Sequence, residues 1–238
     1  MTVLSRRSAL ALAASALPMG TRAAETELDL KLVLAVDASG SVSTERFELQ
    51  KQGYVRAFRD PRVIRAIATL PSQSMAATMM QWTGPSLHIQ VVPWSLLGDA
   101  ASAGMFAERI AAAPRRLFGG GTSISGAIDE ARRLMATFGP PAARNVIDIS
   151  GDGANNAGRR VSAARDEAVA DGVTINGLPI LNVEPDLDEH YRTQVIGGPG
   201  SFMIAIENYG QFAEAIVHKL VTEIADLEGL PRRSGRFG

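Results

Sequence analysis

Residues 34–43 read LAVDASGSVS and place an acidic residue and several hydroxyl residues directly after an apolar run. The run at residues 32–36 is continuously apolar, which is typical of a strand buried on both faces of a parallel sheet. Asp37 ends this predicted strand, and Ser39 and Ser41 follow it at once. A plain turn is one interpretation, because Asp, Ser and Gly are good turn residues. A metal site is the other.

The composition of the chain limits its class. With 238 residues, of which 46% are hydrophobic and 21% charged, it is long enough for one α/β domain with a substantial core. The net charge of −1 gives no reason to expect a nucleic acid or an anionic membrane as partner, since both require a basic surface. The chain has no cysteine, which excludes disulfides, thiolate nucleophiles and zinc–thiolate sites. Any bound metal must therefore use oxygen or imidazole ligands.

The N-terminus has the pattern of an export signal. Ser5-Arg6-Arg7 supplies positive charge, residues 9–17 form a short apolar stretch, and small residues at 21–24 offer a cleavage point. Residues 5–10 also resemble the twin-arginine export motif. An ordinary N-terminal helix is the alternative, and the stretch is shorter than the ~20 apolar residues of a membrane span. We expect residues 1–24 to be an export signal and the mature chain to be periplasmic or secreted, without insertion into the membrane.

Strand-like and helix-like segments alternate along the mature chain. Predicted strands lie at residues 32–36, 75–82, 87–92, 145–150, 173–181 and 202–206. Predicted helices lie at residues 44–59, 63–69, 100–113, 123–138, 161–170, 186–195 and 209–227. The turn signal Thr83-Gly84-Pro85-Ser86 joins two strands closely and predicts one antiparallel strand. We therefore expect a single doubly wound, Rossmann-like α/β domain at residues 28–228, with a mostly parallel sheet, one antiparallel edge strand, helices on both faces, and a flexible tail at 229–238.

Ligands of such folds bind beyond the carboxyl ends of the strands. Three loops at that edge carry oxygen side chains: those after the strands that end at Asp37 and Ser150, and the glycine loop that leads into Thr122. Together the loops hold Asp37, Ser39, Ser41, Thr122 and Asp152. Two carboxylates and three hydroxyls suit Mg²⁺, Mn²⁺ or Ca²⁺ rather than zinc or copper. If the hydroxyls coordinate directly and a carboxylate acts through water, the cation stays electron-poor and can capture an Asp or Glu of a partner.

These residues resemble the metal-ion-dependent adhesion site of the von Willebrand factor A (vWA) domain. That site has the form Asp-x-Ser-x-Ser, then a Thr, then an Asp, and residues 37–41, Thr122 and Asp152 follow that order. The resemblance covers nearly the whole mature chain and implies a vWA fold. Three further stretches lie at residues 146–156, 172–180 and 196–200. They resemble a bacterial, exported branch of the superfamily whose members have no known function.

The resemblance also implies a role for each residue. Ser39 and Ser41 would coordinate the cation directly. Thr122 would bind directly in one state and through water in another. Asp37 and Asp152 would act largely through water or through hydrogen bonds to the ligands.

Several residues near the predicted site can be interpreted in more than one way. Relatives usually have Thr where this chain has Gly151, so a hydroxyl beside Asp152 is missing. Asp148 lies inside an apolar strand, where it either accepts from backbone or arginine donors or supports the metal from the same face. Asn155 and Asn156 are interpreted as turn residues, with an amide near the metal as the alternative. The two tryptophans and the three histidines are expected to be packing or surface residues.

The sequence lacks a residue that each of three classes of enzyme requires. The glycine loop at 118–123 is not followed by the lysine of a phosphate loop. The stretch 121–125 ends in serine where a nucleophile elbow requires glycine. None of the histidines lies on the three loops, so a metal-assisted hydrolase lacks an obvious base, although a carboxylate base stays open.

We therefore predict an exported vWA domain without enzymatic activity, of the adhesion or adaptor type. It binds a divalent cation, Mg²⁺ or else Mn²⁺ or Ca²⁺, and uses it to capture an Asp or Glu side chain of a protein partner. We expect the chain to be a monomer. The alternatives are a metal-dependent hydrolase, which turnover would reveal, and a receptor for a small carboxylate ligand, which would need a deeper pocket beside the cation.

Overall fold

The centre of the molecule is a five-stranded sheet with the strand order β3-β2-β1-β4-β5. The computed structural model describes residues 27–225 and 235–236, so the predicted export signal and most of the predicted tail lie outside the described residues. The strands are β1 (Leu28–Asp37), β2 (Met75–Trp82), β3 (His88–Leu97), β4 (Ala142–Gly151) and β5 (Val173–Pro179). Four of them run parallel, and β3 is antiparallel to β2. The prediction of a mostly parallel sheet with one antiparallel edge strand is confirmed.

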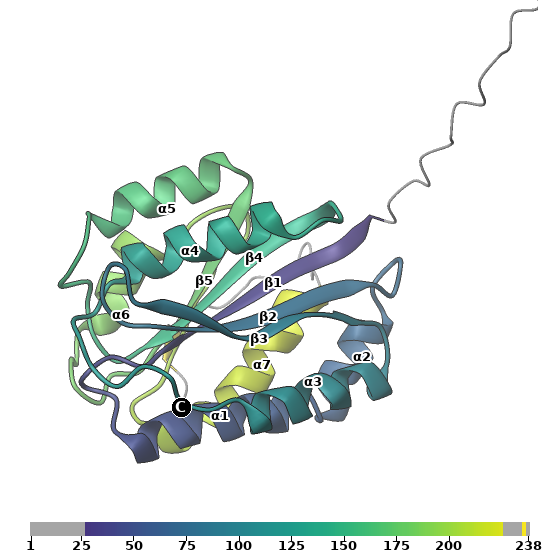
Figure 1. Ribbon diagram of the computed structural model, residues 1–238, viewed down its shortest axis with the longest axis horizontal. Helices are drawn as coiled ribbons and strands as arrows, with labels where there is room; N and C mark the ends of the chain where they lie inside the picture. The colour runs from purple at the N-terminus through teal and green to yellow at the C-terminus, as the bar shows by residue number, and fades with distance from the viewer. Residues whose placement is uncertain (1–26, 226–234, 237–238) are drawn as a thin grey trace, which may run out of the picture.

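Helices cover both faces of the sheet, as Figure 1 shows. One layer holds α1 (Thr44–Ala57), α2 (Pro61–Ala68), α3 (Ala100–Ala112) and α7 (Phe212–Ile224). The other holds α4 (Ile124–Thr137), α5 (Val161–Ala170) and α6 (Leu187–His190). None of the helices in the described part of the chain combines the length and the apolar character that crossing a membrane requires.

The continuous apolar run of β1 supplies both cores at once. Because successive side chains of a strand point to opposite faces, Leu32 and Leu34 enter one core while Val33 and Ala35 enter the other. β1 lies between β2 and β4, so both of its edges are paired as well. A strand in this position is held rigidly, and its carboxyl end at Asp37 is therefore a fixed point on which a site can be built.

Some segments end elsewhere than the pattern predicts. β3 continues past the predicted end at residue 92 to Leu97, and Pro93 is tolerated because an edge strand leaves one side of its backbone unpaired. The predicted helix at 186–195 changes after α6 into a π-helix at Tyr191–Val195. Of the predicted strand at 202–206, β6 (Ile204–Ala205) is regular, and it pairs in parallel with β7 (Gly235–Arg236).

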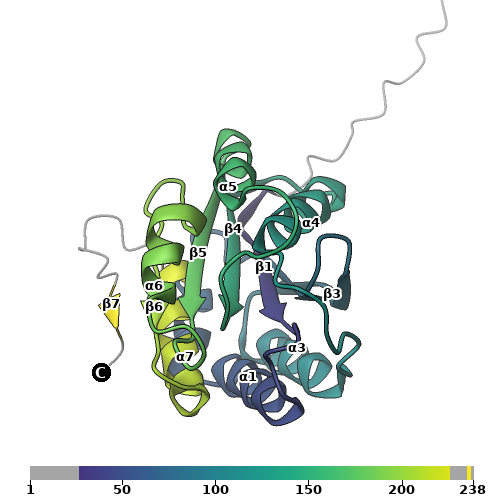
Figure 2. The same cartoon turned by 90° about the vertical axis from the view of Figure 1, so that its left-hand side faces the viewer.

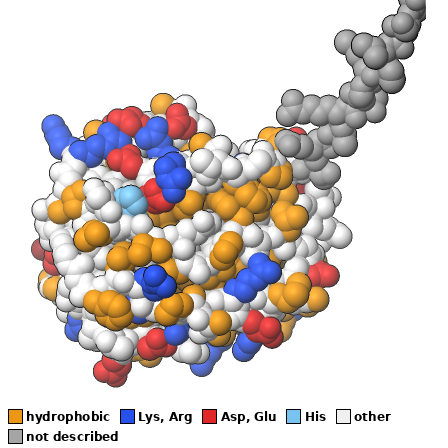
Figure 3. Space-filling model, in the orientation of Figure 1, with side chains coloured by type: hydrophobic (Ala, Val, Ile, Leu, Met, Phe, Trp, Pro, Cys, Tyr) orange, Lys and Arg blue, Asp and Glu red, His pale blue; other side chains and the backbone are white. Residues whose placement is uncertain are grey.

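β3 forms one edge of the sheet and carries several hydrophobic side chains. Ile89 and Leu96 are exposed there, and the Trp94 ring stacks on Phe138 at 4.6 Å between ring centroids. Hydrophobic side chains show on this side of the molecule in Figure 3. The register of β3 against β2 is irregular, and together with Pro93 this irregularity makes the edge a poor template for pairing with another strand.

Candidate metal centre

The loop after β1 is folded around the carboxylate of Asp37. Its Oδ1 accepts the Ser39 N–H at 2.7 Å, and its Oδ2 accepts the Asp152 N–H at 3.4 Å. Ser39 Oγ and Ser41 Oγ share a hydrogen bond at 3.2 Å, and Ser41 Oγ also donates to Asp152 Oδ1. The Gln50 amide donates to the Asp37 carbonyl at 3.1 Å and so ties the loop to α1. The structure thus joins the four predicted residues of these two loops in one hydrogen-bonded group.

Asp152 has two further partners on its other side. The Tyr209 hydroxyl donates to its Oδ2 at 2.8 Å. Arg46 Nη1 lies 3.6 Å from the same oxygen and donates to the Ser41 carbonyl at 2.9 Å. A second guanidinium lies at the same loop, because Arg115 donates to the Ala38 carbonyl at 3.1 Å and to the Val42 carbonyl at 2.8 Å.

Burial of the two carboxylates raises the free energy of their charged forms. Asp37 and Asp152 are both fully buried. Burial raises the pKa of Asp37 to about 7; the Ser39 N–H opposes this shift and the negative charge of Asp152 adds to it. Burial and the charge of Asp152 likewise raise the pKa of Tyr209 above its usual range. A cation between the two carboxylates would offset this cost.

Thr122 reaches the same place by way of the glycine loop. Gly120 has a φ of +104°, a conformation that favours glycine, and its carbonyl lies 3.5 Å from where a β-carbon of Gly40 would be. Asn156 Oδ1 accepts the Thr122 N–H at 2.8 Å, while the Asn156 N–H donates to the Thr122 carbonyl at 2.9 Å. Thr122 Oγ1 lies 3.4 Å from the position of a β-carbon at Gly153. The hydroxyl is therefore held beside the loop that carries the second aspartate.

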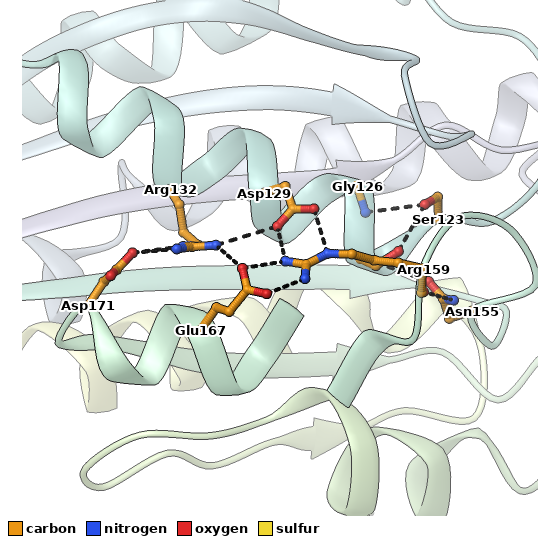
Figure 4. A network of polar contacts seen from close by, with 9 residues as sticks. Ser123, Gly126, Asp129, Arg132, Asn155, Arg159, Glu167 and Asp171 are labelled. Carbon is orange, nitrogen blue, oxygen red and sulfur yellow. Dashed lines mark hydrogen bonds and ion pairs between the residues drawn. The ribbon is translucent and has the colours of Figure 1, made fainter. Parts of the chain in front are cut away.

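A second link between these loops comes from Asn155 and an arginine network. Asn155 Oδ1 accepts the Ser125 N–H at 3.0 Å, and its amide donates to the Arg159 carbonyl at 3.2 Å. Arg159 lies between two acidic side chains, 2.7 Å from Asp129 Oδ1 and 2.8 Å from Glu167 Oε2 (Figure 4). The network ties the loop after β4 to α4 and α5. The interpretation of both asparagines as turn residues is incomplete, because their side chains join two loops.

The surroundings of Gly151 leave little room for a side chain. A β-carbon there would lie 2.9 Å from Asp37 Oδ2, 3.2 Å from the Tyr191 hydroxyl and 3.3 Å from the Trp82 ring. Tyr191 takes this space because Gly177 leaves room for its ring, which a β-carbon would approach to 2.5 Å. Within the described residues the buried Tyr191 hydroxyl has no hydrogen-bond partner. The space beside Gly151 is thus taken by a buried tyrosine from the segment after β5.

Besides Arg46, Tyr191 and Tyr209, two further residues near the site were not expected from the sequence. Glu184 Oε2 accepts the Ala154 N–H at 3.1 Å, and His190 Nε2 accepts the Asn155 N–H at 3.2 Å. Burial lowers the pKa of His190, and the charge of Glu184 opposes that shift. A carboxylate in the loop that follows the strand at 173–181 was the available signal, because that strand ends at the same edge of the sheet.

Asp148 belongs to a different part of the molecule. Its carboxylate lies 2.6 Å from Lys219 Nζ, and Lys219 also pairs with Glu223. All three side chains are buried. The expectation of backbone or arginine partners was wrong, because the cation is a lysine that the apolar sequence of the last helix concealed.

The predicted donors fit a hard divalent cation in their chemistry. Two carboxylates and two serine hydroxyls meet where the carboxyl ends of β1 and β4 lie side by side, at the end of the molecule that faces the viewer in Figure 2. The Thr122 hydroxyl lies beside Gly153, next to the second aspartate. Nowhere in residues 27–225 and 235–236 do three Asp, Glu, His or Cys side chains form a group that could hold an ion by themselves. Hydroxyl ligands would therefore be essential here.

Comparisons with known proteins agree with this fold. Residues 27–228 match the family described as "Protein of unknown function (DUF1194)". No curated protein matches the chain.

Several solved structures are similar in fold at low sequence identity. A von Willebrand factor type A protein from Catenulispora acidiphila has a TM-score of 0.59 at 16% identity, over 83% of this chain and 43% of that one. The vWF domain of the type V pili tip protein Mfa5 from Porphyromonas gingivalis has a TM-score of 0.57 at 11% identity, over 84% and 97%. Proximal thread matrix protein 1 from the mussel byssus, with a zinc-occupied MIDAS motif, has a TM-score of 0.60 at 15% identity, over 86% and 49%. This chain spans less than half of the first and third proteins, and these likenesses establish the fold.

Proposed function

Because this chain belongs to the family described as "Protein of unknown function (DUF1194)" and has the fold of a von Willebrand factor A domain, we propose that it binds a divalent cation and uses it to capture an acidic side chain of a partner protein. The observation that carries the proposal is the convergence of Asp37, Ser39, Ser41 and Asp152 in one hydrogen-bonded group at the carboxyl edge of the sheet.

The hydroxyl groups would coordinate the cation, and the carboxylates would support them. Ser39, Ser41 and Thr122 would present hydroxyl oxygens, while Asp37 and Asp152 orient the serines and supply negative charge. A divalent cation bound here would act as a Lewis acid toward an incoming carboxylate. Mg²⁺, Mn²⁺ and Ca²⁺ all prefer oxygen ligands. The zinc-occupied MIDAS motif of the mussel protein supports a divalent site in this fold and leaves the identity of the metal here to experiment.

The absence of histidine from the predicted loops supports binding rather than catalysis. The three predicted loops carry no histidine, and His190, which lies next to them, engages its Nε2 with the Asn155 backbone. The remaining candidate for a base beside the hydroxyls is the carboxylate of Glu184, whose Oε2 accepts the Ala154 N–H. We propose that the protein is exported, periplasmic or secreted, and acts as an adhesion- or adaptor-type module. The pilus and byssus proteins of the same fold support an interaction role.

Calorimetric titration tests the proposal. Mg²⁺, Mn²⁺ and Ca²⁺ are titrated into the EDTA-treated protein and into the variants Asp37→Ala and Ser39→Ala. We expect saturable binding of at least one cation by the wild type and loss of binding in both variants. Capture of a partner in a pull-down should then depend on the cation and be abolished by EDTA. Equal binding by the wild type and both variants would place the cation elsewhere, and turnover of a substrate abolished by Asp152→Ala would favour an enzyme.

A further inference from the structure

We infer that Glu184 is an additional residue of the proposed cation site, a carboxylate of this chain that holds a cation-bound water on the side of Thr122. The inference rests on the proposed function, because it requires a cation between the loops. Glu184 is not among the residues that the vWA motif supplies. It comes from the loop between β5 and α6, which lies at the same edge of the sheet as the motif loops.

The position of Glu184 is set by one of its two oxygens. Oε2 accepts the Ala154 N–H at 3.1 Å. The other oxygen, Oε1, faces the backbone of Gly153, where a β-carbon would lie 3.5 Å from Glu184 Oε1 and 3.4 Å from Thr122 Oγ1. The carboxylate and the predicted hydroxyl ligand therefore both lie next to a residue without a side chain.

Gly153 is the reason that the two groups share this space. Its β-carbon would meet its nearest neighbours at 3.4–3.8 Å, which is ordinary van der Waals contact, and its φ is outside the left-handed range. Neither a steric clash nor the backbone thus requires glycine here. Thr122 Oγ1 and Glu184 Oε1 both border the side of Gly153 on which a β-carbon would lie, and the proposed water belongs on that side.

Action through water also fits the separation of the acidic groups. Asp37, Asp152 and Glu184 do not form a group of three that could hold an ion by themselves in the described chain. Carboxylates that hydrogen-bond to metal ligands or metal-bound water orient the ligands and raise affinity, and their removal typically costs 10–100-fold in metal affinity. Glu184 is half-buried, so its charge is screened less than that of a surface carboxylate.

The loop itself does not depend on the charge of Glu184. Ala154 donates its N–H to Glu184, and the next residue, Asn155, donates its N–H to His190. Two consecutive hydrogen bonds therefore hold the backbone of the loop after β4. In the variant Glu184→Gln the side-chain carbonyl can still accept the Ala154 N–H. This variant therefore removes the negative charge while keeping the shape and the hydrogen bond.

Titration of Mn²⁺ by calorimetry tests the inference in the full chain. The variants are Glu184→Gln, Gly153→Ala, Asp37→Ala and, as a matched control, Glu189→Gln, which removes an equal charge from the nearby surface pair with Arg192. We expect Glu184→Gln to bind Mn²⁺ about tenfold more weakly than the wild type. Gly153→Ala should weaken binding as well, because its methyl group displaces the proposed water while Glu184 keeps its charge. Glu189→Gln should bind like the wild type.

The outcomes separate this inference from the proposed function. If the wild type binds Mn²⁺, Asp37→Ala does not, and Glu184→Gln and Gly153→Ala bind like the wild type, the role of Glu184 is overturned and the cation site stands. If the wild type shows no saturable binding, both are overturned. Equal weakening by Glu184→Gln and Glu189→Gln would reduce the effect to general surface charge and also overturn it. Thermal unfolding in EDTA, expected to be the same for Glu184→Gln and the wild type, shows that the variant is folded.

Discussion

Gly151 shows how one residue without a side chain sets the geometry of the candidate site. The residue lies at the end of β4, where a β-carbon would approach Asp37 Oδ2 to 2.9 Å and the Tyr191 hydroxyl to 3.2 Å. Both oxygens are buried and held by surrounding structure. A larger residue would therefore have to push Asp37 out of the position from which it orients Ser39.

We predict that Gly151→Ala destabilises the protein by about 1–3 kcal/mol, the usual cost of forcing extra atoms into a packed interior. Urea denaturation measures the change in the free energy of unfolding. Gly153→Ala is the matched control two residues away, and it should change stability little because its contacts are of ordinary length. A Gly151→Ala variant as stable as the wild type would show that the space around Asp37 is not filled as described.

Site residues that are close together in the sequence were predicted better than contacts between residues that are far apart in it. Asp37, Ser39 and Ser41 follow one another along the chain, so one strand end places them together. Tyr191 and Glu184 come near Asp37 and Thr122 because the segment after β5 folds back over the sheet, and no local pattern encodes that return. The ion pair of Asp148 was missed for the same reason, since Lys219 lies 71 positions further along the sequence.

At the scale of elements, α7 is joined to the sheet by a buried group of charges. Lys219 of α7 lies 2.6 Å from Asp148 of β4, and it pairs with Glu223 one turn further along the helix. Asn176 of β5 donates to Glu223 at 2.9 Å. Two carboxylates share a single lysine here, and each of the three charged side chains is buried.

We predict that Lys219→Met destabilises the protein by about 3–5 kcal/mol, because it leaves two buried carboxylates facing each other without a cation. The control is Lys51→Met, which breaks the surface pair with Glu48 and should cost at most about 1 kcal/mol. Chemical denaturation of both variants provides the measurement. A loss of stability of similar size in the two would mean that the buried pair contributes no more than a surface one.

The same group predicts a dependence of stability on pH. Burial, followed by the negative charge of Asp148, raises the pKa of Glu223 to about 7. The folded protein then binds a proton at Glu223 more tightly than the unfolded chain does, so this residue's contribution to stability is present at low pH and is lost as the pH rises from about 4.5 to 7. We predict that wild type loses free energy of unfolding relative to Glu223→Gln over this interval. Parallel stability curves for the two proteins in EDTA, measured from pH 4.5 to 8, would contradict this.

The order and type of the main elements could be predicted, while several of their ends could not. Apolar periodicity and turn residues located the strands of the main sheet and the helices between them. The extension of β3 past Pro93 depends on its place at the edge of the sheet, which is a property of the whole fold. The π-helix at Tyr191–Val195 packs its Tyr191 ring against Gly177 of β5, a residue distant in sequence, and it has no local signature in the sequence.

At the scale of the whole molecule, three loops far apart in the sequence meet at one end of the sheet. β1 and β4 are neighbours and parallel, so their carboxyl ends bring Asp37 and Asp152 together. The side chains of Asn155 and Asn156 then hold the glycine loop against the second of these ends. The alternation of strands and helices predicted this convergence in outline, because parallel strands place all their carboxyl ends at the same edge.

We predict that a bound cation stabilises the whole domain. A ligand that binds only the folded state adds about 2.7 kcal/mol to the free energy of unfolding at a concentration 100 times its Kd. Thermal unfolding with Mg²⁺, Mn²⁺ or Ca²⁺ and with EDTA measures the shift, and Ser39→Ala should abolish it. A shift of equal size in Ser39→Ala would come from ions bound at another place.

Anomalous diffraction from crystals grown with Mn²⁺ tests the central claim most directly. A cation at the candidate site should give an anomalous peak at about 2.0–2.6 Å from Ser39 Oγ and Ser41 Oγ, the range of oxygen–cation distances for such ions. The peak should disappear in crystals of Ser39→Ala. A peak remote from Asp37 and Asp152, or none at a saturating concentration of Mn²⁺, would contradict the account.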